Sequence, residues 1–288
     1  VKQFEYIPYL AFEADPQMLE QMRNDESVLH IEEDIIGDAA LAQSTQIVGA
    51  PAAWSSGYTG KGQTVAILDS GVSNHEALRG RYLAAVDFTT SNGKGQDDLG
   101  HGTHIAGIIG GRSAEFAGVA PGANLVSLKV LGADGSGLTS DVINAIDWAI
   151  ANRQKYNLRI LNLSLGRPVF ESYVDDPLCQ AVERAYKAGL VVVASAGNYG
   201  QTEDGRNVIG GITSPGNSPY AITVGALDGR GTVRRSDDVV ADFSSRGPTL
   251  YDRIVKPDLA APGRRLHSLY SPGSTLADEV SKRRMRAC

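Results

Sequence analysis

The stretch Val65-Ala-Ile-Leu-Asp69-Ser-Gly71 decides the fold of this chain. Its four consecutive apolar residues predict a strand that is buried on both faces, because strands of a parallel sheet covered by helices are apolar throughout instead of alternating. The Ser-Gly pair predicts a turn directly after Asp69. The carboxylate of Asp69 therefore lies at the carboxyl end of a strand, where open α/β sheets bind their ligands. In isolation, an Asp at this place fits a role in the turn better.

The second decisive string is Gly100-His101-Gly-Thr-His104-Ile-Ala-Gly107, which predicts a buried helix with a histidine at its start. The flanking glycines leave the imidazole of His101 uncrowded, and Thr103 can cap the first turn. An acid at a strand end and a histidine at a helix start are the pair by which nucleophilic hydrolases orient and activate a base. We interpret His101 as the catalytic base, Asp69 as the carboxylate that orients it, and His104 as a packing residue.

Two other kinds of site fit these residues less well. The His-x-x-His spacing beside Asp97 and Asp98 offers ligands for a metal, but no third soft ligand lies nearby. An acid after a strand also begins many nucleotide-binding folds, yet no G-x-G-x-x-G or P-loop string occurs, and Gly135-Ser-Gly137 lacks a third glycine. The sequence therefore predicts neither a metal site nor a phosphate-binding loop.

From Gln46 onward, strands alternate with helices, which is the pattern of a parallel sheet covered on both faces. Gly189 is a typical residue for the end of a helix. The predicted fold class is α/β, a doubly wound and mostly parallel sheet with helices on both faces. We expect strands at residues 64–68, 124–129, 160–163, 190–194 and 221–224, and helices at residues 103–109, 140–153 and 177–188.

The beginning of the chain has a different pattern and predicts a small α+β unit. Residues 4–13 alternate as a strand does, Asp15-Pro16 begins a helix, and residues 28–33 form a second short strand. A strand–helix–strand piece of this size cannot bury a core alone. An ordinary appendage at the edge of the main domain is one interpretation of this unit.

Charge and composition exclude several classes of function. The net charge of −6 and the lack of a basic stripe argue against nucleic acid as a main partner. No apolar run reaches the ~18–20 residues that a membrane-spanning helix needs, and no signal-peptide pattern is visible at the start of the sequence. Two cysteines do not make a disulfide framework, and we interpret Cys179 as a small core residue.

Together with Ser195-Ala-Gly-Asn198, the two decisive strings closely resemble those of the subtilisin-like serine proteases, the subtilases. Further similar strings lie at residues 213–216, 242–248 and 255–263. The resemblance implies an Asp-His-Ser triad that includes Asp69 and His101, and an oxyanion hole that includes Asn198. A side-chain amide is the right group to donate a hydrogen bond to a developing oxyanion, whereas a single Asn after a strand also fits a left-handed turn.

The same resemblance assigns a set of residues to substrate binding. They are Gly135, Ser136, Gly137, Ser164, Leu165, Gly166, Ala196 and Gly197. The first three are similar to a segment that pairs with extended peptides, and the next three to a wall of the primary specificity pocket. Because backbone pairing makes few demands on sequence, we expect protein or peptide substrates and a broad preference for apolar residues before the cleaved bond.

The resemblance breaks after Gly263. In the family, a Gly-Thr-Ser string that carries the nucleophile follows the Ala-Pro-Gly motif, whereas no Gly-Thr-Ser occurs in these 288 residues. We therefore expect a serine endopeptidase whose nucleophile is absent from this chain, which is itself inactive. The alternative is a catalytically inactive homologue that acts as a peptide-binding or regulatory protein. The presence of Asp69, His101 and Asn198 favours the peptidase.

Further expectations follow from the resemblance. Residues 1–42 resemble the C-terminal part of an inhibitory propeptide, which would make the chain a zymogen with its own propeptide as a partner. Residues 43–288 resemble a catalytic domain that is incomplete at its C-terminus. Calcium is a common ligand in the family, but residues 110–118 lack the oxygen donors that would place a site. The family also implies a secreted, extracellular protein.

Overall fold

The computed structural model describes residues 2–3, 10–11, 16–25, 27–28, 40–89, 95–113 and 117–278. Contacts within the chain divide it into two compact units, residues 39–280 and residues 1–38 together with 281–288. The larger unit contains every candidate site residue.

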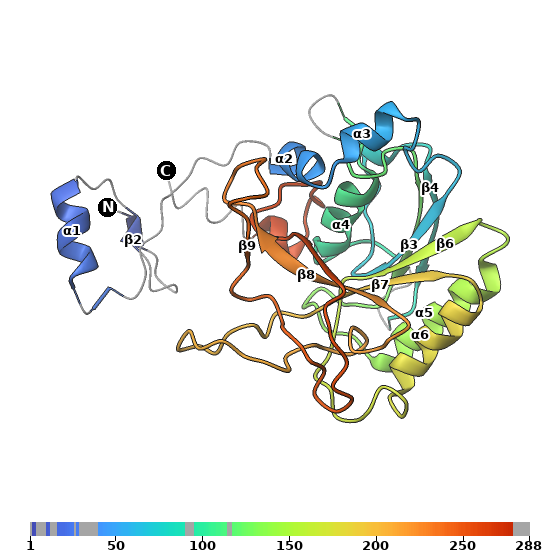
Figure 1. Cartoon of the computed structure of the whole chain (residues 1–288). Coiled ribbons are helices and arrows are strands. Elements are labelled where there is room, and N and C mark those ends of the chain that lie inside the picture. Colours follow the sequence, from blue (N-terminus) through green and yellow to red (C-terminus); the bar gives the residue numbers. More distant parts are fainter. Residues whose placement is uncertain are drawn as a thin grey trace. The chain divides into compact units, whose positions relative to one another are not determined.

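Within the described residues, an eight-stranded sheet forms the centre of the larger unit (Figure 1). Neighbouring strands are parallel along the order β10-β8-β7-β6-β3-β5-β4, and β9 pairs antiparallel with β8. The carboxyl ends of the parallel strands therefore meet at one edge of the sheet. The strands are β3 (Thr64–Asp69), β4 (Tyr82–Asp87), β5 (Asn124–Lys129), β6 (Leu158–Leu163), β7 (Val191–Ser195), β8 (Ile222–Asp228), β9 (Val239–Val240) and β10 (Leu259–Pro262).

Two helices, α5 (Thr139–Asn152) and α6 (Pro177–Lys187), cover one face of this sheet and lie side by side (Figure 1). They belong to the larger apolar cluster, which also contains Ala66 and Leu68 of β3. The carboxylate of Asp176 caps α6 by accepting hydrogen bonds from the first backbone N–H groups of the helix.

The opposite face is covered by α4 (His101–Gly110) and a short 3-10 helix, Glu76–Leu78. Their apolar residues form a second cluster with Val65 and Ile67, which alternate along β3 with the residues of the first cluster. Every residue of β3 is buried, so the predicted doubly wound, mostly parallel α/β fold is confirmed. No helix among the described residues is long and apolar enough to cross a membrane.

The expected strands and helices of the larger unit are present, with small differences at their ends. The largest difference is in β8, which continues to Asp228 instead of ending at residue 224. The prediction missed α2 (Ala40–Ile47), α3 (Ala50–Ser55), β4, β9 and β10. These elements give weak signals: β4 is a partly exposed edge strand, and β9 has two residues.

The smaller unit contains β1 (Lys2–Gln3) and β2 (Leu10–Ala11), which pair antiparallel, and α1 (Pro16–Arg23). The helix begins at the predicted proline. Most of the two strands expected over residues 4–13 and 28–33 lies outside the described residues. Residues 40–42, expected in the propeptide, belong to α2 of the larger unit, and the interpretation of the remaining residues as a propeptide stays a prediction.

Candidate active site

Asp69 and His101 meet at the carboxyl edge of the sheet. Asp69 is the last residue of β3, and His101 is the first residue of α4. The Nδ1 atom of His101 lies 2.8 Å from Oδ1 and 2.9 Å from Oδ2 of Asp69. The Asp69 side chain is fully buried, whereas that of His101 is 39% exposed. The carboxylate accepts a hydrogen bond from the Nδ1–H group, so the partly exposed imidazole keeps Nε2 for other partners.

The electrostatic surroundings distinguish His101 from His104, one turn further along α4. The hydrogen bond to the Asp69 carboxylate raises the pKa of His101; the charges of Asp69 and Asp97 act in the same direction, and burial opposes them. Burial lowers the pKa of His104, whose Nε2 lies 3.1 Å from the carbonyl oxygen of Leu266. The structure therefore pairs His101 with a carboxylate and packs His104 against a loop.

Two glycines let α4 approach β3 this closely. A Cβ atom at Gly102 would lie 2.0 Å from the carbonyl oxygen of Gly71 and 3.2 Å from Cβ of Asp69. Gly100, just before the helix, has a φ of 103°, in the left-handed region that favours glycine. The glycines beside His101 thus permit the close approach of two backbones, in addition to leaving the imidazole room.

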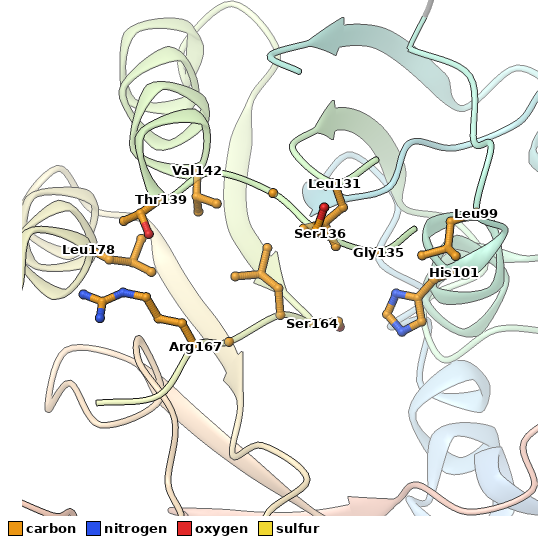
Figure 2. A pocket seen from close by; sticks show the side chains of 13 residues that line it. Leu99, His101, Leu131, Gly135, Ser136, Thr139, Val142, Ser164, Arg167 and Leu178 are labelled. Atoms are coloured by element: carbon orange, nitrogen blue, oxygen red, sulfur yellow. The ribbon is translucent and has the colours of Figure 1, made fainter. Parts of the chain in front are cut away.

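A pocket of about 470 Å³ extends from His101 across the edge of the sheet (Figure 2). The loop after β5 and the residues after β6 contribute six of the eight residues assigned to substrate binding. In Figure 2, His101 and Leu99 lie to the right of the pocket, and Thr139, Arg167 and Leu178 lie to its left. The six residues are Gly135, Ser136, Gly137, Ser164, Leu165 and Gly166.

The loop that follows β7 carries the other two assigned residues and Asn198. Ala196 and Gly197 are not among the residues that line the pocket. The carbonyl oxygen of Ala196 accepts a hydrogen bond from the backbone N–H of Thr213, and that of Gly197 accepts one from Ser245. These bonds hold the loop in place, while Asn198 is exposed. Its strand, β7, lies two positions from β3 in the sheet, so Asn198 follows a strand end at the same edge as Asp69.

Comparison with known proteins identifies the family. A sequence profile of the Subtilase family matches residues 60–285, which span most of the chain. The chain belongs to the subtilase family. This confirms the resemblance to subtilases that was seen in the strings containing Asp69, His101 and Asn198.

Named relatives support the same assignment. Serine protease AprX of Bacillus subtilis (strain 168) is 42% identical over 237 residues, with 78% of this chain and 51% of AprX covered. Subtilisin E of the same organism is 37% identical over 285 residues, with 95% and 66% covered. The crystal structure of a cold adapted subtilisin-like serine proteinase matches at a TM-score of 0.58 and 33% identity, covering 75% of this chain and 68% of that one. The chain thus spans between half and two thirds of AprX and Subtilisin E.

The sequence analysis did not identify Arg167, which lines one end of the pocket. The Nη2 atom of Arg167 lies 2.9 Å from Oδ1 of Asp176, whose side chain is fully buried. Figure 2 shows the guanidinium directed away from His101, on the side of Leu178. The Asp-Pro pair at the start of α6 is a helix-start signal that could have indicated the buried carboxylate, but its pairing with Arg167 depends on tertiary contact.

The two histidines considered as metal ligands have other partners in the structure. Among the described residues, no group of three or more His, Cys, Asp or Glu side chains could hold a metal ion. His101 and His104, the ligands of that alternative, face Asp69 and the carbonyl oxygen of Leu266. The calcium expected from the family resemblance stays a prediction, and no site is assigned to it.

Cys179 lies in α6, and its side chain is free and buried. Burial raises the pKa of its thiol to about 12. The thiol therefore stays protonated at neutral pH and is a poor nucleophile. A core position, as expected from the sequence, fits these properties.

Proposed function

We propose that the complete protein is a serine endopeptidase of the subtilisin type that hydrolyses protein or peptide substrates. The observation that carries this proposal is the hydrogen-bonded Asp69–His101 pair beside a pocket that residues 135–137 and 164–166 line. Membership of the subtilase family supports it. The proposal refers to the complete protein because the chain covers 51–66% of AprX and Subtilisin E.

In the proposed mechanism, His101 is the general base. Its Nε2 takes the proton of a serine hydroxyl as the oxygen attacks the scissile carbonyl, and later gives this proton to the leaving amine. Asp69 holds the ring in the tautomer that leaves Nε2 unprotonated, and it stabilises the imidazolium. Asn198 donates a hydrogen bond from its amide to the oxyanion.

Substrate binding in this proposal is mainly through the backbone. An extended peptide would pair with the chain at residues 135–137 and 164–166 on two sides of the pocket. The apolar side chains of Leu99, Leu131 and Leu165 also line it. Their chemistry supports a broad preference for apolar residues on the side of the peptide that precedes the cleaved bond.

The 288 residues contain no Gly-Thr-Ser string, and we infer that none of their serines is the nucleophile of the proposed triad. We expect the 288-residue chain alone to be inactive, because removing the nucleophile of a subtilisin lowers turnover by about 10⁶-fold. Inhibition by the residues before α2 as a propeptide and an extracellular place of action belong to the same proposal and rest on the family resemblance.

The test uses a fluorophosphonate, which labels activated serines, and a peptide-hydrolysis assay. The coding sequence after the codon for Cys288 is read first, and the chain is expressed with and without that continuation. We expect the extended protein to be labelled at one serine and to hydrolyse peptides. The matched control is the extended protein with His101→Ala, which should neither be labelled by the fluorophosphonate nor hydrolyse peptides.

Two results would contradict the peptidase. One is a continuation without a Gly-Thr-Ser string, and the other is an extended protein that contains the string but hydrolyses nothing. In either case, binding of unlabelled peptides, measured by calorimetry, would test the alternative of a peptide-binding homologue. Stoichiometric labelling of one serine in the 288-residue chain would refute its expected inactivity.

A further inference from the structure

A second buried carboxylate, Asp97, lies beside the Asp69–His101 pair. The residue is 3% exposed. Its Oδ1 atom accepts hydrogen bonds from Oγ of Ser70 and from the backbone N–H of Gly100, both at 2.7 Å, and its Oδ2 atom accepts one from the N–H of Thr103 at 2.8 Å. All three partners are donors. Asp97 therefore binds the first turn of α4, where the N–H groups of a helix lack partners within the helix.

Ser70 connects this carboxylate to the catalytic one. Its backbone N–H donates to Oδ1 of Asp69 at 2.7 Å, while its hydroxyl donates to Asp97 and lies 3.2 Å from Oδ1 of Asp69. The same hydroxyl accepts the N–H of Gly102 at 3.0 Å. The end of β3 and the start of α4 are thus joined by Ser70 and Asp97, which bond to backbone N–H groups on either side of His101 in the sequence.

The loop that carries Asp97 is fixed from two other directions. The backbone carbonyl oxygen of Asp97 accepts a hydrogen bond from Oγ of Ser271 at 2.8 Å. Nζ of Lys129, a buried residue of β5, donates to the carbonyl oxygen of Gln96 at 2.7 Å and to Oδ2 of Asp98 at 2.8 Å. Asp97 therefore lies between two anchored neighbours, and its carboxylate cannot move without breaking several bonds.

We propose that Asp97 is a positioning residue for His101, which sets the place of the imidazole relative to Asp69 by holding the N-terminus of α4 against Ser70. The proposal rests on the function proposed above for Asp69 and His101. A carboxylate is needed at this position because three donors converge on it. An amide would turn its NH₂ group toward one of those donors and leave buried N–H groups without acceptors.

The charged groups near His101 come from three places. Asp69 contacts it from the end of β3, Asp97 acts on it from the loop before α4, and His104 follows one turn along the helix. The carboxylates of both Asp69 and Asp97 raise the pKa of His101. Because the charge of Asp97 by itself raises this pKa, a positioning role is separated from a charge effect by a variant that breaks the Ser70 link and leaves the charge in place.

The experiment measures the His101 pKa by NMR titration of the imidazole in the full 288-residue chain and in three variants. D97N removes the charge and one acceptor, S70A removes the connection between the two carboxylates, and D98N is the matched control. Asp98 is on the same loop, but its 52% exposed side chain contacts Lys129 instead of α4. Thermal unfolding of each variant reports whether it folds.

We expect D97N to lower the His101 pKa more than D98N does, and to move the amide proton signals of Gly100 and Thr103 upfield as they lose a charged acceptor. S70A should give a smaller shift of the same sign. S70A decides whether or not D97N folds, because it keeps both carboxylate charges. An unchanged His101 pKa in S70A, or an equal one in D97N and D98N, would overturn the proposal.

This readout does not depend on hydrolysis. If the extended protein proves inactive while S70A still shifts the His101 pKa, then the proposed function fails and the positioning role stands. If the extended protein is active and the titration is insensitive to D97N, then the positioning role fails alone.

Discussion

Strand β3 is buried both within the sheet and at its carboxyl end, but the two regions are held together differently. On the faces, Ala66, Ile67 and Leu68 of β3 are at most 1% exposed and belong to the two apolar clusters. At the edge, Asp69 and Ser70 are 0% exposed and are polar. Each of these polar groups has a specific hydrogen-bond partner at a fixed distance.

The difference determines what a substitution does in each region. Apolar burial is non-directional and scales with area, so a loss on a face lowers the stability of the whole domain. A buried polar group is stabilised only by its particular partners. A loss at the edge therefore changes local geometry and the pKa of His101, the properties that a catalytic pair needs.

The largest effect is expected from Asp69→Asn at the edge. In the extended, active protein this variant should lower kcat by about 10⁴-fold, because an amide cannot hold the imidazole in the tautomer that leaves Nε2 free. The pKa of His101 should fall as the main cause of its elevation is removed. Peptide hydrolysis and NMR titration measure the two effects.

Thermal unfolding of Asp69→Asn, measured in parallel, shows whether the variant remains folded. The midpoint of unfolding should change little compared with that of a core variant. A kcat within ten-fold of the wild type would refute the role of Asp69, and unfolding at room temperature would assign Asp69 to the core instead of the edge.

A substitution on a face of the sheet should lower the stability of the domain and leave the pKa of His101 unchanged. Leu128→Ala, at a fully buried position of β5, is expected to lower the free energy of unfolding by about 2–5 kcal/mol, from lost burial and the cavity that remains. The pKa of His101 should stay the same. Val255→Ala is the matched control, because Val255 is 84% exposed and its truncation should cost within about 0.5 kcal/mol.

Urea unfolding of the three proteins tests this prediction. A shift of the His101 pKa in Leu128→Ala would show that the two regions are coupled, contrary to the separation described above. Equal stabilities of Leu128→Ala and Val255→Ala would contradict the burial of β5.

A third variant tests a part of the edge that the pocket does not include. Asn198→Ala should lower kcat of the extended protein by about 10²–10³-fold, because one donor to the oxyanion is lost. KM and the unfolding midpoint should change little, since Asn198 is exposed. If KM rose and kcat stayed constant, Asn198 would instead contribute to substrate binding.

The sequence predicted much of this site because its decisive residues lie in contiguous strings. The apolar run before Asp69 indicated both the strand and its end, and the glycines around His101 indicated the helix start. Backbone continuity placed the two residues at one edge of a parallel sheet. The expectation that residues 135–137 and 164–166 bind substrate now rests also on their shared pocket.

The parts that were missed depend on contacts between distant residues. Arg167 pairs with Asp176 across a loop, and Asp97 bonds to Ser70, 27 positions earlier. Neither pairing leaves a periodic pattern in the sequence. The edge strand β4 was missed although residues 82–86 are apolar, because only their pairing with β5 shows that this short run is a strand. Tertiary context, which a single sequence does not contain, decides all three.

The smallest effects are expected from pH, and they distinguish the two histidines of α4. The pKa of His101 is raised in the folded state by its bond to Asp69, while an unfolded histidine has a pKa of about 6.5. The protonated His101 therefore contributes stability below about pH 6.5, and this contribution is lost as the pH rises through the raised pKa. For His104, burial lowers the pKa, so its contribution is present above about pH 6.5 and is lost as the pH falls through the lowered pKa.

Urea unfolding of the wild type, His101→Gln and His104→Gln between about pH 5 and pH 9 tests these signs. The stability lost by His101→Gln relative to the wild type should grow as the pH falls, whereas the stability lost by His104→Gln should shrink. Both variants remove the same titrating group from the same helix, so a general effect of net charge would give them equal slopes. Slopes of opposite sign can arise only from the local surroundings, a carboxylate for His101 and a buried loop for His104. Equal slopes would remove the distinction between the edge and the packed side of α4.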